Sequence, residues 1–217
     1  LARMLDRPVK WIEGRGESFQ ATNHARDQIQ TLRAAVAPDG LIEALEFSIL
    51  ANLGAYGANA VPINTGRMAT GPYRVRDVRV RVVGAMTNTT PTGAYRGAGR
   101  PEAAYALERL TDAIARELGL DPFAVRRRNA LPPDAFPYSA PTGVRPDSGD
   151  YGQALDEAAR IIDLPAFRAE QAAARDAGRL LGLGVALYCE FAGPGWDSAQ
   201  VRAQPDGTVT VAVGVSP

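Results

Sequence analysis

The chain has 217 residues, of which 46% are hydrophobic and 22% are charged, ordinary values for a globular protein with a sizeable core. Its 24 basic and 24 acidic residues give a net charge of +0, so no long-range field favours nucleic acid or an anionic membrane surface. The single cysteine, Cys189, excludes an intrachain disulfide and a metal site of clustered cysteines, and no apolar run is long enough to span a bilayer.

The first half of the chain is predicted to form strands joined by turns. Alternating or β-branched apolar residues predict four strands, over residues 8–12, 28–36, 41–53 and 75–85. Pro38-Asp39-Gly40 lies between the second and third of these strands and predicts a hairpin turn. Residues 54–72 show little periodicity, which indicates a loop or a broken helix.

The clearest predicted helix opens at Pro101 and ends at Gly119. Asp112 and Arg116 are spaced to pair on its polar face. Its core-facing side is predicted from an apolar stripe of Leu107, Leu110, Ile114 and Leu118.

The last third of the chain alternates predicted helices with irregular segments. Asp121 caps a second helix that runs to about Asn129, and the proline-rich residues 131–149 then form an irregular crossing. Further elements are helices over 151–162 and 165–177, a strand over 180–191, and a hairpin of residues 199–204 and 208–214. The predicted fold class is α+β, with mixed sheets and flanking helices.

The stretch from Thr92 to Glu102 separates a predicted strand from a predicted helix and reads Thr-Gly-Ala-Tyr-Arg-Gly-Ala-Gly-Arg-Pro-Glu. Three glycines, Gly93, Gly97 and Gly99, suit a backbone that turns tightly and approaches a neighbour closely. A loop at a helix N-terminus is predicted to present free N–H groups, which would suit an anion or an oxo group. The alternative is a tight strand-to-helix connection without a ligand.

Residues 94–102 resemble the loop near molybdenum in the large subunits of the xanthine dehydrogenase family, which includes aldehyde oxidases and carbon monoxide dehydrogenases. The similarity continues, in order, through four further stretches: residues 7–11, 22–28, 70–73 and 121–129. It implies a molybdenum-cofactor-binding domain of aldehyde oxidase type. Residues 1–179 would form part of a first cofactor-binding subdomain, and residues 180–217 would begin a second, truncated one.

The resemblance implies that the chain is a fragment of a molybdenum hydroxylase catalytic subunit. Such an enzyme oxidises an aldehyde or N-heterocyclic carbon with water as the oxygen source. It uses a molybdenum-molybdopterin cofactor, with cytosine dinucleotide as one form. Its partners are an FAD-binding medium subunit and a 2Fe-2S small subunit in a cytoplasmic oligomer. The general-base glutamate is expected beyond the chain end, so the fragment alone is expected to be inactive and without cofactor. The alternative is a non-catalytic α+β binding or assembly domain.

The same resemblance assigns cofactor contacts to Tyr95, Arg96, Gly97 and Gly99, and a substrate-facing position to Ala98. For Arg96 the alternative role is a salt bridge that anchors the loop, and Tyr95 is expected to pack rather than to catalyse. No residue is assigned to bind metal directly, and a single histidine, His24, is poor evidence for a ligand.

Three positions depart from the pattern of particular family members. Gly97 stands where carbon monoxide dehydrogenases carry a copper-holding cysteine, and copper(I) needs a thiolate. Ala98 stands where xanthine dehydrogenases carry an aromatic residue that stacks on substrate, and Asn64 where they carry a substrate-binding arginine. These departures argue against copper chemistry and leave purine specificity in doubt.

Overall fold

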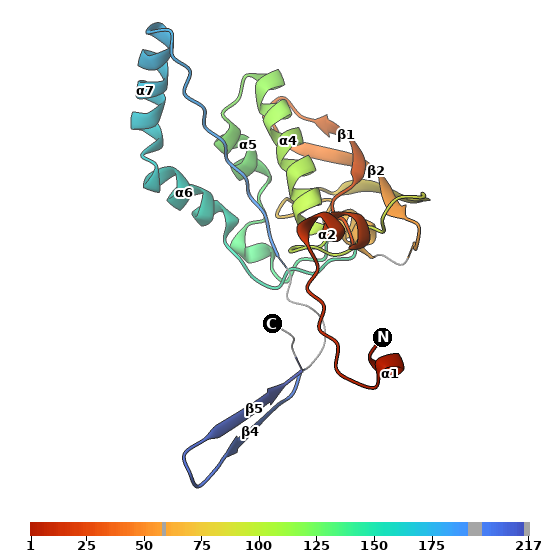
Figure 1. Ribbon diagram of the computed structural model, residues 1–217. Helices are drawn as coiled ribbons and strands as arrows, with labels where there is room; N and C mark the ends of the chain where they lie inside the picture. Colours follow the sequence, from red (N-terminus) through yellow and green to blue (C-terminus); the bar gives the residue numbers. More distant parts are fainter. Residues whose placement is uncertain (58–59, 191–196, 215–217) are drawn as a thin grey trace.

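The computed structural model describes residues 1–57, 60–190 and 197–214. Its centre is a three-stranded mixed sheet in the order β1-β2-β3 (Figure 1). Strand β1 (Gln28–Val36) pairs antiparallel with β2 (Ile42–Gly54), and β2 pairs parallel with β3 (Asp77–Met86). The predicted α+β class with a mixed sheet is confirmed, and so are three of the four strands predicted in the first half.

Local chemistry fixes the two connections within this sheet. Between β1 and β2, Gly40 adopts a φ of 84°, and the Leu41 N–H donates to Asp39 Oδ1 at 3.2 Å, which gives the predicted hairpin. Between β2 and β3, the ambiguous segment contains helix α3 (Val61–Arg67). A crossover of this kind is what allows β3 to lie parallel to β2.

Helices α4 (Arg100–Leu118) and α5 (Pro122–Asn129) supply much of the core. Residues Leu107 and Ile114 of the predicted α4 stripe are buried against Ile42 and Leu45 of β2. As predicted, Asp121 caps α5: its Oδ1 accepts from the N–H groups of Phe123 and Ala124. The remaining helices are α1 (Ala2–Leu5), α2 (Arg15–Ala21), the 3₁₀ turn η1 (Pro133–Ala135), α6 (Tyr151–Ile161) and α7 (Leu164–Asp176).

Two predicted strands were wrong. Residues 8–12 are exposed and irregular, because no strand in the described part of the chain pairs with them. Residues 180–190 are irregular as well: they run back along the core, where Val185 and Leu187 pack against it. Residue 191 of the second prediction lies outside the described residues. An apolar run satisfies burial in either form, so it did not distinguish a strand from a packed irregular segment.

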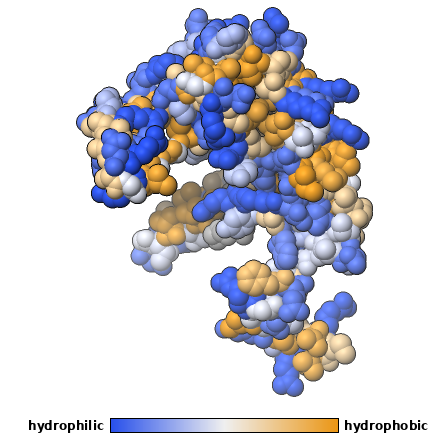
Figure 2. Space-filling model, turned by 90° about the horizontal axis from the view of Figure 1, so that it is seen from above, coloured by the Kyte–Doolittle hydropathy of each residue, from blue (hydrophilic) through white to orange (hydrophobic). Residues whose placement is uncertain are grey.

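The predicted C-terminal hairpin is confirmed as β4 (Ala199–Ala203) and β5 (Val209–Val213), which are exposed throughout and extend away from the sheet and helices (Figure 1). The boundary at residues 179 and 180 stays a prediction. Hydrophobic and hydrophilic side chains are interleaved on the face shown in Figure 2. Within the described residues, no helix combines the length and the apolar character that a membrane crossing needs.

Candidate functional site

The loop before α4 turns sharply through three successive residues with positive φ. Gly97, Ala98 and Gly99 have φ values of 92°, 40° and 103°. Two hydrogen bonds close the turn: the Ala98 N–H donates to the Tyr95 carbonyl at 2.9 Å, and the Arg100 N–H donates to the Gly97 carbonyl at 3.1 Å. A non-glycine residue at positive φ is uncommon, so the surrounding structure must hold this conformation.

Glycine is required at two positions of this turn by close packing as well as by φ. A Cβ on Gly97 would lie 2.5 Å from Pro101 Cγ. A Cβ on Gly99 would lie 2.7 Å from both the Thr65 nitrogen and the Val61 carbonyl oxygen of α3. The spacing of glycines in the sequence therefore reflects real close approaches, as predicted.

Residues 24–26 of the N-terminal segment contact the loop and stabilise its backbone. The Arg26 guanidinium donates from Nη2 to the Arg96 carbonyl at 2.6 Å and lies 5.0 Å from the centre of the Tyr95 ring. The Gly93 N–H donates to the His24 carbonyl at 2.7 Å. The His24 imidazole is hydrogen-bonded through Nε2 to the Phe19 carbonyl oxygen at 2.9 Å. Residues 22–28 and 92–99 thus form one unit.

At the N-terminus of α4, two of the donors that were predicted to be free are already used within the protein. The buried Glu102 carboxylate accepts from the Gly99 N–H at 3.0 Å, the Arg100 N–H is used within the turn, and Pro101 has none. The sequence carried the signal, because a glutamate three residues after the cap is a capping position. One turn earlier, the Arg96 and Gly97 N–H groups have no acceptor among the described residues.

The side chains at the predicted site differ in exposure. The Arg96 side chain is exposed, and no acidic group of the described residues pairs with it, so the salt-bridge alternative has no partner there. Tyr95 is also exposed and packs against Arg26 rather than in the core. Ala98 is half-buried, and its carbonyl accepts from Asn64 Nδ2 at 3.3 Å. The exposed Arg96 side chain and the half-buried Ala98 therefore belong to the same short turn at the protein surface.

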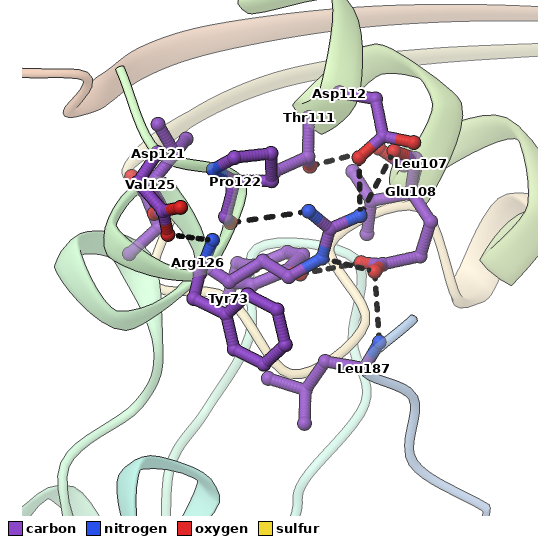
Figure 3. A network of polar contacts seen from close by, with 12 residues as sticks. Tyr73, Leu107, Glu108, Thr111, Asp112, Asp121, Pro122, Val125, Arg126 and Leu187 are labelled. Atoms are coloured by element: carbon purple, nitrogen blue, oxygen red, sulfur yellow. Dashed lines mark hydrogen bonds and ion pairs between the residues drawn. The ribbon is translucent and has the colours of Figure 1, made fainter. Parts of the chain in front are cut away.

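A buried polar network that the sequence did not predict lies beneath α4 (Figure 3). Glu108 accepts from the Tyr73 hydroxyl, from Arg126 Nε at 2.7 Å and from the Leu187 N–H at 2.8 Å. Arg126 Nη2 also donates to Asp112 Oδ1 at 2.8 Å, so Asp112 binds Arg126 and not Arg116 as predicted. Burial and the neighbouring Glu108 raise the pKa of Tyr73 well above its ordinary value, so its hydroxyl stays protonated as a donor.

The segment fixed by this network ends beside the loop. Leu187 is held by Glu108, and three residues later Glu190 Oε1 lies 3.1 Å from Arg100 Nε at the start of α4. This ion pair is close enough for charge attraction, but its angles are not those of a hydrogen bond. The network therefore fixes the helix that follows the loop, and through it the position of the turn.

Comparison with known proteins identifies the domain. The model of the family described as the molybdopterin cofactor-binding domain matches residues 1–130, which include the whole loop, and the chain belongs to this family. The resemblance found in the sequence is thereby confirmed.

Individual relatives agree with this assignment. The chain is 35% identical to the carbon monoxide dehydrogenase large chain of Hydrogenophaga pseudoflava and 32% identical to the nicotine 6-hydroxylase large subunit of Paenarthrobacter nicotinovorans. These alignments cover 97% and 99% of this chain. All of it superimposes on quinoline 2-oxidoreductase from Pseudomonas putida 86, with a TM-score of 0.90 and 36% identity. The chain spans 29%, 28% and 30% of the length of these three relatives.

Proposed function

We propose that this chain forms the molybdenum-cofactor-binding part of a hydroxylase large subunit, and that the turn at residues 95–99 contacts the cofactor. One observation carries the proposal. The turn presents the unpaired N–H groups of Arg96 and Gly97 together with an arginine side chain that has no acidic partner in the described structure. Such a corner can accept an anionic or oxo-bearing group.

The residues of the turn fit a cofactor that approaches the backbone closely. A side chain at position 97 would clash with Pro101, which explains the glycine there. Because glycine has no side chain, its backbone N–H stays accessible to a bound group. Arg26 donates a hydrogen bond to the Arg96 carbonyl and so fixes the backbone, while the Arg96 side chain is exposed and can contact a bound group. When bound, the molybdenum cofactor would supply the redox centre for hydroxylation with oxygen from water.

The substrate class follows from the residues at positions 97 and 98. No thiolate belongs to the turn: the single cysteine, Cys189, is half-buried and packs against the core. Ala98 offers a small methyl group and no ring for stacking. Two of the relatives are named for nicotine and quinoline, which are N-heterocycles. An aldehyde or N-heterocyclic carbon therefore suits this site better than carbon monoxide.

The remaining parts of such an enzyme are proposed from the family. The general-base glutamate is expected beyond residue 217. The electrons are expected to leave through a 2Fe-2S small subunit and an FAD-binding medium subunit in a cytoplasmic oligomer, with cytosine dinucleotide as one form of the pterin. The 217-residue chain alone is expected to show no turnover, and stoichiometric molybdenum with turnover in it would contradict this.

The role of Arg96 can be tested in a complete subunit that contains this sequence. Arg96→Ala should reduce molybdenum per chain or activity with an N-heterocyclic substrate, while the melting temperature stays close to that of the parent. Arg33→Ala is the matched control, because Arg33 is an exposed arginine on β1 that pairs with Glu46. Full molybdenum content together with full activity in Arg96→Ala would contradict this role and favour the non-catalytic binding or assembly domain.

A further inference from the structure

Among the described residues, strand β1 lies at the edge of its sheet, and a groove of about 750 Å³ lies between it and α4. The groove begins at Arg26, the residue that holds the cofactor loop. Its walls include Gln28, Gln30 and Leu32 of β1 and Pro101, Tyr105 and Arg109 of α4. Figure 1 shows α4 crossing over the sheet beside this strand.

The direction of the β1 backbone groups follows from one hydrogen bond. The Asn52 N–H donates to the Asp27 carbonyl at 3.0 Å, and the register then runs unbroken from Gln28 opposite Ala51 to Ala35 opposite Ala44. In an antiparallel pair, alternate residues direct their backbone groups to the same neighbour. Odd-numbered residues therefore face β2, and the open edge carries the N–H and C=O groups of Gln28, Gln30, Leu32 and Ala34.

The same four residues place their side chains on the helix side of the sheet, where they are half-buried. A strand added to this edge would thus continue the hydrogen-bond ladder and insert alternate side chains into the groove against α4. Nothing on β1 blocks such pairing. The strand has no proline, its register shift comes only at its end, and its one charge, Arg33, pairs with Glu46 on the opposite face.

The groove is cationic at both ends. Arg26 stands at one end and Arg109 at the other, and Arg109 has no acidic partner within the described residues. Among the described residues that line the groove, the one carboxylate is Glu102, which is buried and already accepts from the Gly99 N–H. If a second copy of this chain docked through the same edge, its Arg26 and Arg109 would meet those of the first copy, which disfavours this pairing.

We propose that the β1 edge and this groove bind an extended segment of a partner protein whose acidic side chains meet Arg26 and Arg109. Pro101 marks the Arg26 end of the groove, because it adjoins Gly97 in the turn that Arg26 holds. Helix α4 rises about 1.5 Å per residue, so Pro101 and Arg109 lie about 12 Å apart along it. A strand at about 3.4 Å per residue covers that distance in four residues. The segment therefore carries acids at positions i and i+4, with an apolar residue at i+2 facing Tyr105 and Leu32. This inference does not rest on the proposed cofactor role.

The probe is the end-capped peptide Thr-Glu-Thr-Val-Thr-Glu-Thr, which reads the same in both directions and so fits either strand orientation. Its control replaces both glutamates with lysine. Added at millimolar concentration to an isotope-labelled complete subunit that contains this sequence, the acidic peptide should shift the amide resonances of Gln28, Gln30, Leu32 and Ala34 more than those of Ile29 and Thr31. The lysine peptide should shift none of them.

Two substitutions separate charge from backbone pairing. Arg109→Glu should weaken binding of the acidic peptide roughly two- to fivefold or more, whereas Arg116→Glu, an exposed arginine elsewhere on α4, should not. Gln30→Pro removes one outward N–H without touching the bonds to β2, so it should weaken binding while the spectrum of the fold persists.

Any of three results would overturn the proposal. The first is an unchanged spectrum with the acidic peptide, and the second is equal shifts from both peptides. The third is a concentration-dependent shift of the β1 amides without peptide, which would make a second copy of the chain the occupant.

Discussion

Arg126 and Glu108 form the most deeply buried ion pair of the described structure, with Arg126 Nε 2.7 Å from Glu108 Oε2 and the Arg126 side chain 0% exposed. The pair joins α5 to α4, and Glu108 extends it to Tyr73 and to the backbone of Leu187. A buried charge is tolerable only with such partners. The network therefore holds α4, and with α4 the turn that precedes it.

Breaking this pair should cost far more stability than breaking a surface pair. Arg126→Met leaves Glu108 buried without its counter-charge, and we expect a loss of about 3–5 kcal/mol in the free energy of unfolding. Arg127→Met, which removes the neighbouring exposed pair with Asp156, should cost no more than about 1 kcal/mol. Urea denaturation of both variants provides the measurement. Equal losses would show that the network is not a major support of the fold.

The apolar stripe of α4 makes a second prediction about stability. Leu107 is 1% exposed, so Leu107→Ala should lower the free energy of unfolding by about 2–5 kcal/mol. Leu118 belongs to the same stripe but is 37% exposed at the end of the helix, and Leu118→Ala should cost clearly less. Thermal unfolding of the pair checks the order, and a larger loss for Leu118→Ala would reverse the assignment of the core face.

A pH effect is expected at the hairpin turn. The hydrogen bond from Arg128, followed by that from the Leu41 N–H, holds the pKa of Asp39 below its ordinary value of 3.8. Because the pKa is lowered in the folded state, the stability from this pair is present above pH 3.8 and is lost as the pH falls through the lower folded value. Titration by NMR should show Arg128→Ala moving the Asp39 pKa upward. An unchanged midpoint would contradict the pairing.

Much of the fold could be predicted because its elements depend on local patterns. The alternation in β1 to β3, the stripe of α4 and the Asp121 cap are each visible in neighbouring residues. Residues 8–12 and 180–190 could not be placed, because a strand exists only where another strand pairs with it. Arg126 could not be recognised as buried, since it begins a run of three arginines that suggests an exposed face. Its partners lie 14 and 18 residues away.

At the candidate site the sequence predicted the turn but not which donors are open. Gly97 and Gly99 occupy the predicted tight approaches, while Glu102 takes the helix donor that was expected to be free. The roles of Tyr95, Arg96, Gly97, Ala98 and Gly99 toward a cofactor and its substrate remain predictions.

Position 99 should tolerate no residue larger than glycine, because it packs closely against α3. Gly99→Ala combines a φ of 103° with contacts of 2.7 Å to α3 backbone atoms, so the turn and α3 must separate. Gly143→Ala has a similar φ of 82° but meets nothing within 4 Å. We expect the first variant to lose more stability than the strain of about 1–2 kcal/mol common to both. Equal melting temperatures would show that α3 does not fix the loop.

The most direct test of the cofactor assignment is the molybdenum content per chain of three variants of a complete subunit that contains this sequence. Gly97→Val forces a β-branched side chain into the turn and should lower molybdenum content. Gly143→Val carries a comparable backbone penalty in a separate turn, which the Gly143 N–H closes on the Ala140 carbonyl, and should not lower it. His24→Ala should keep its molybdenum, because that imidazole contacts only the Phe19 carbonyl among the described residues. Full molybdenum in Gly97→Val, together with a loss in His24→Ala, would show that the turn is only a connection and that the cofactor binds elsewhere.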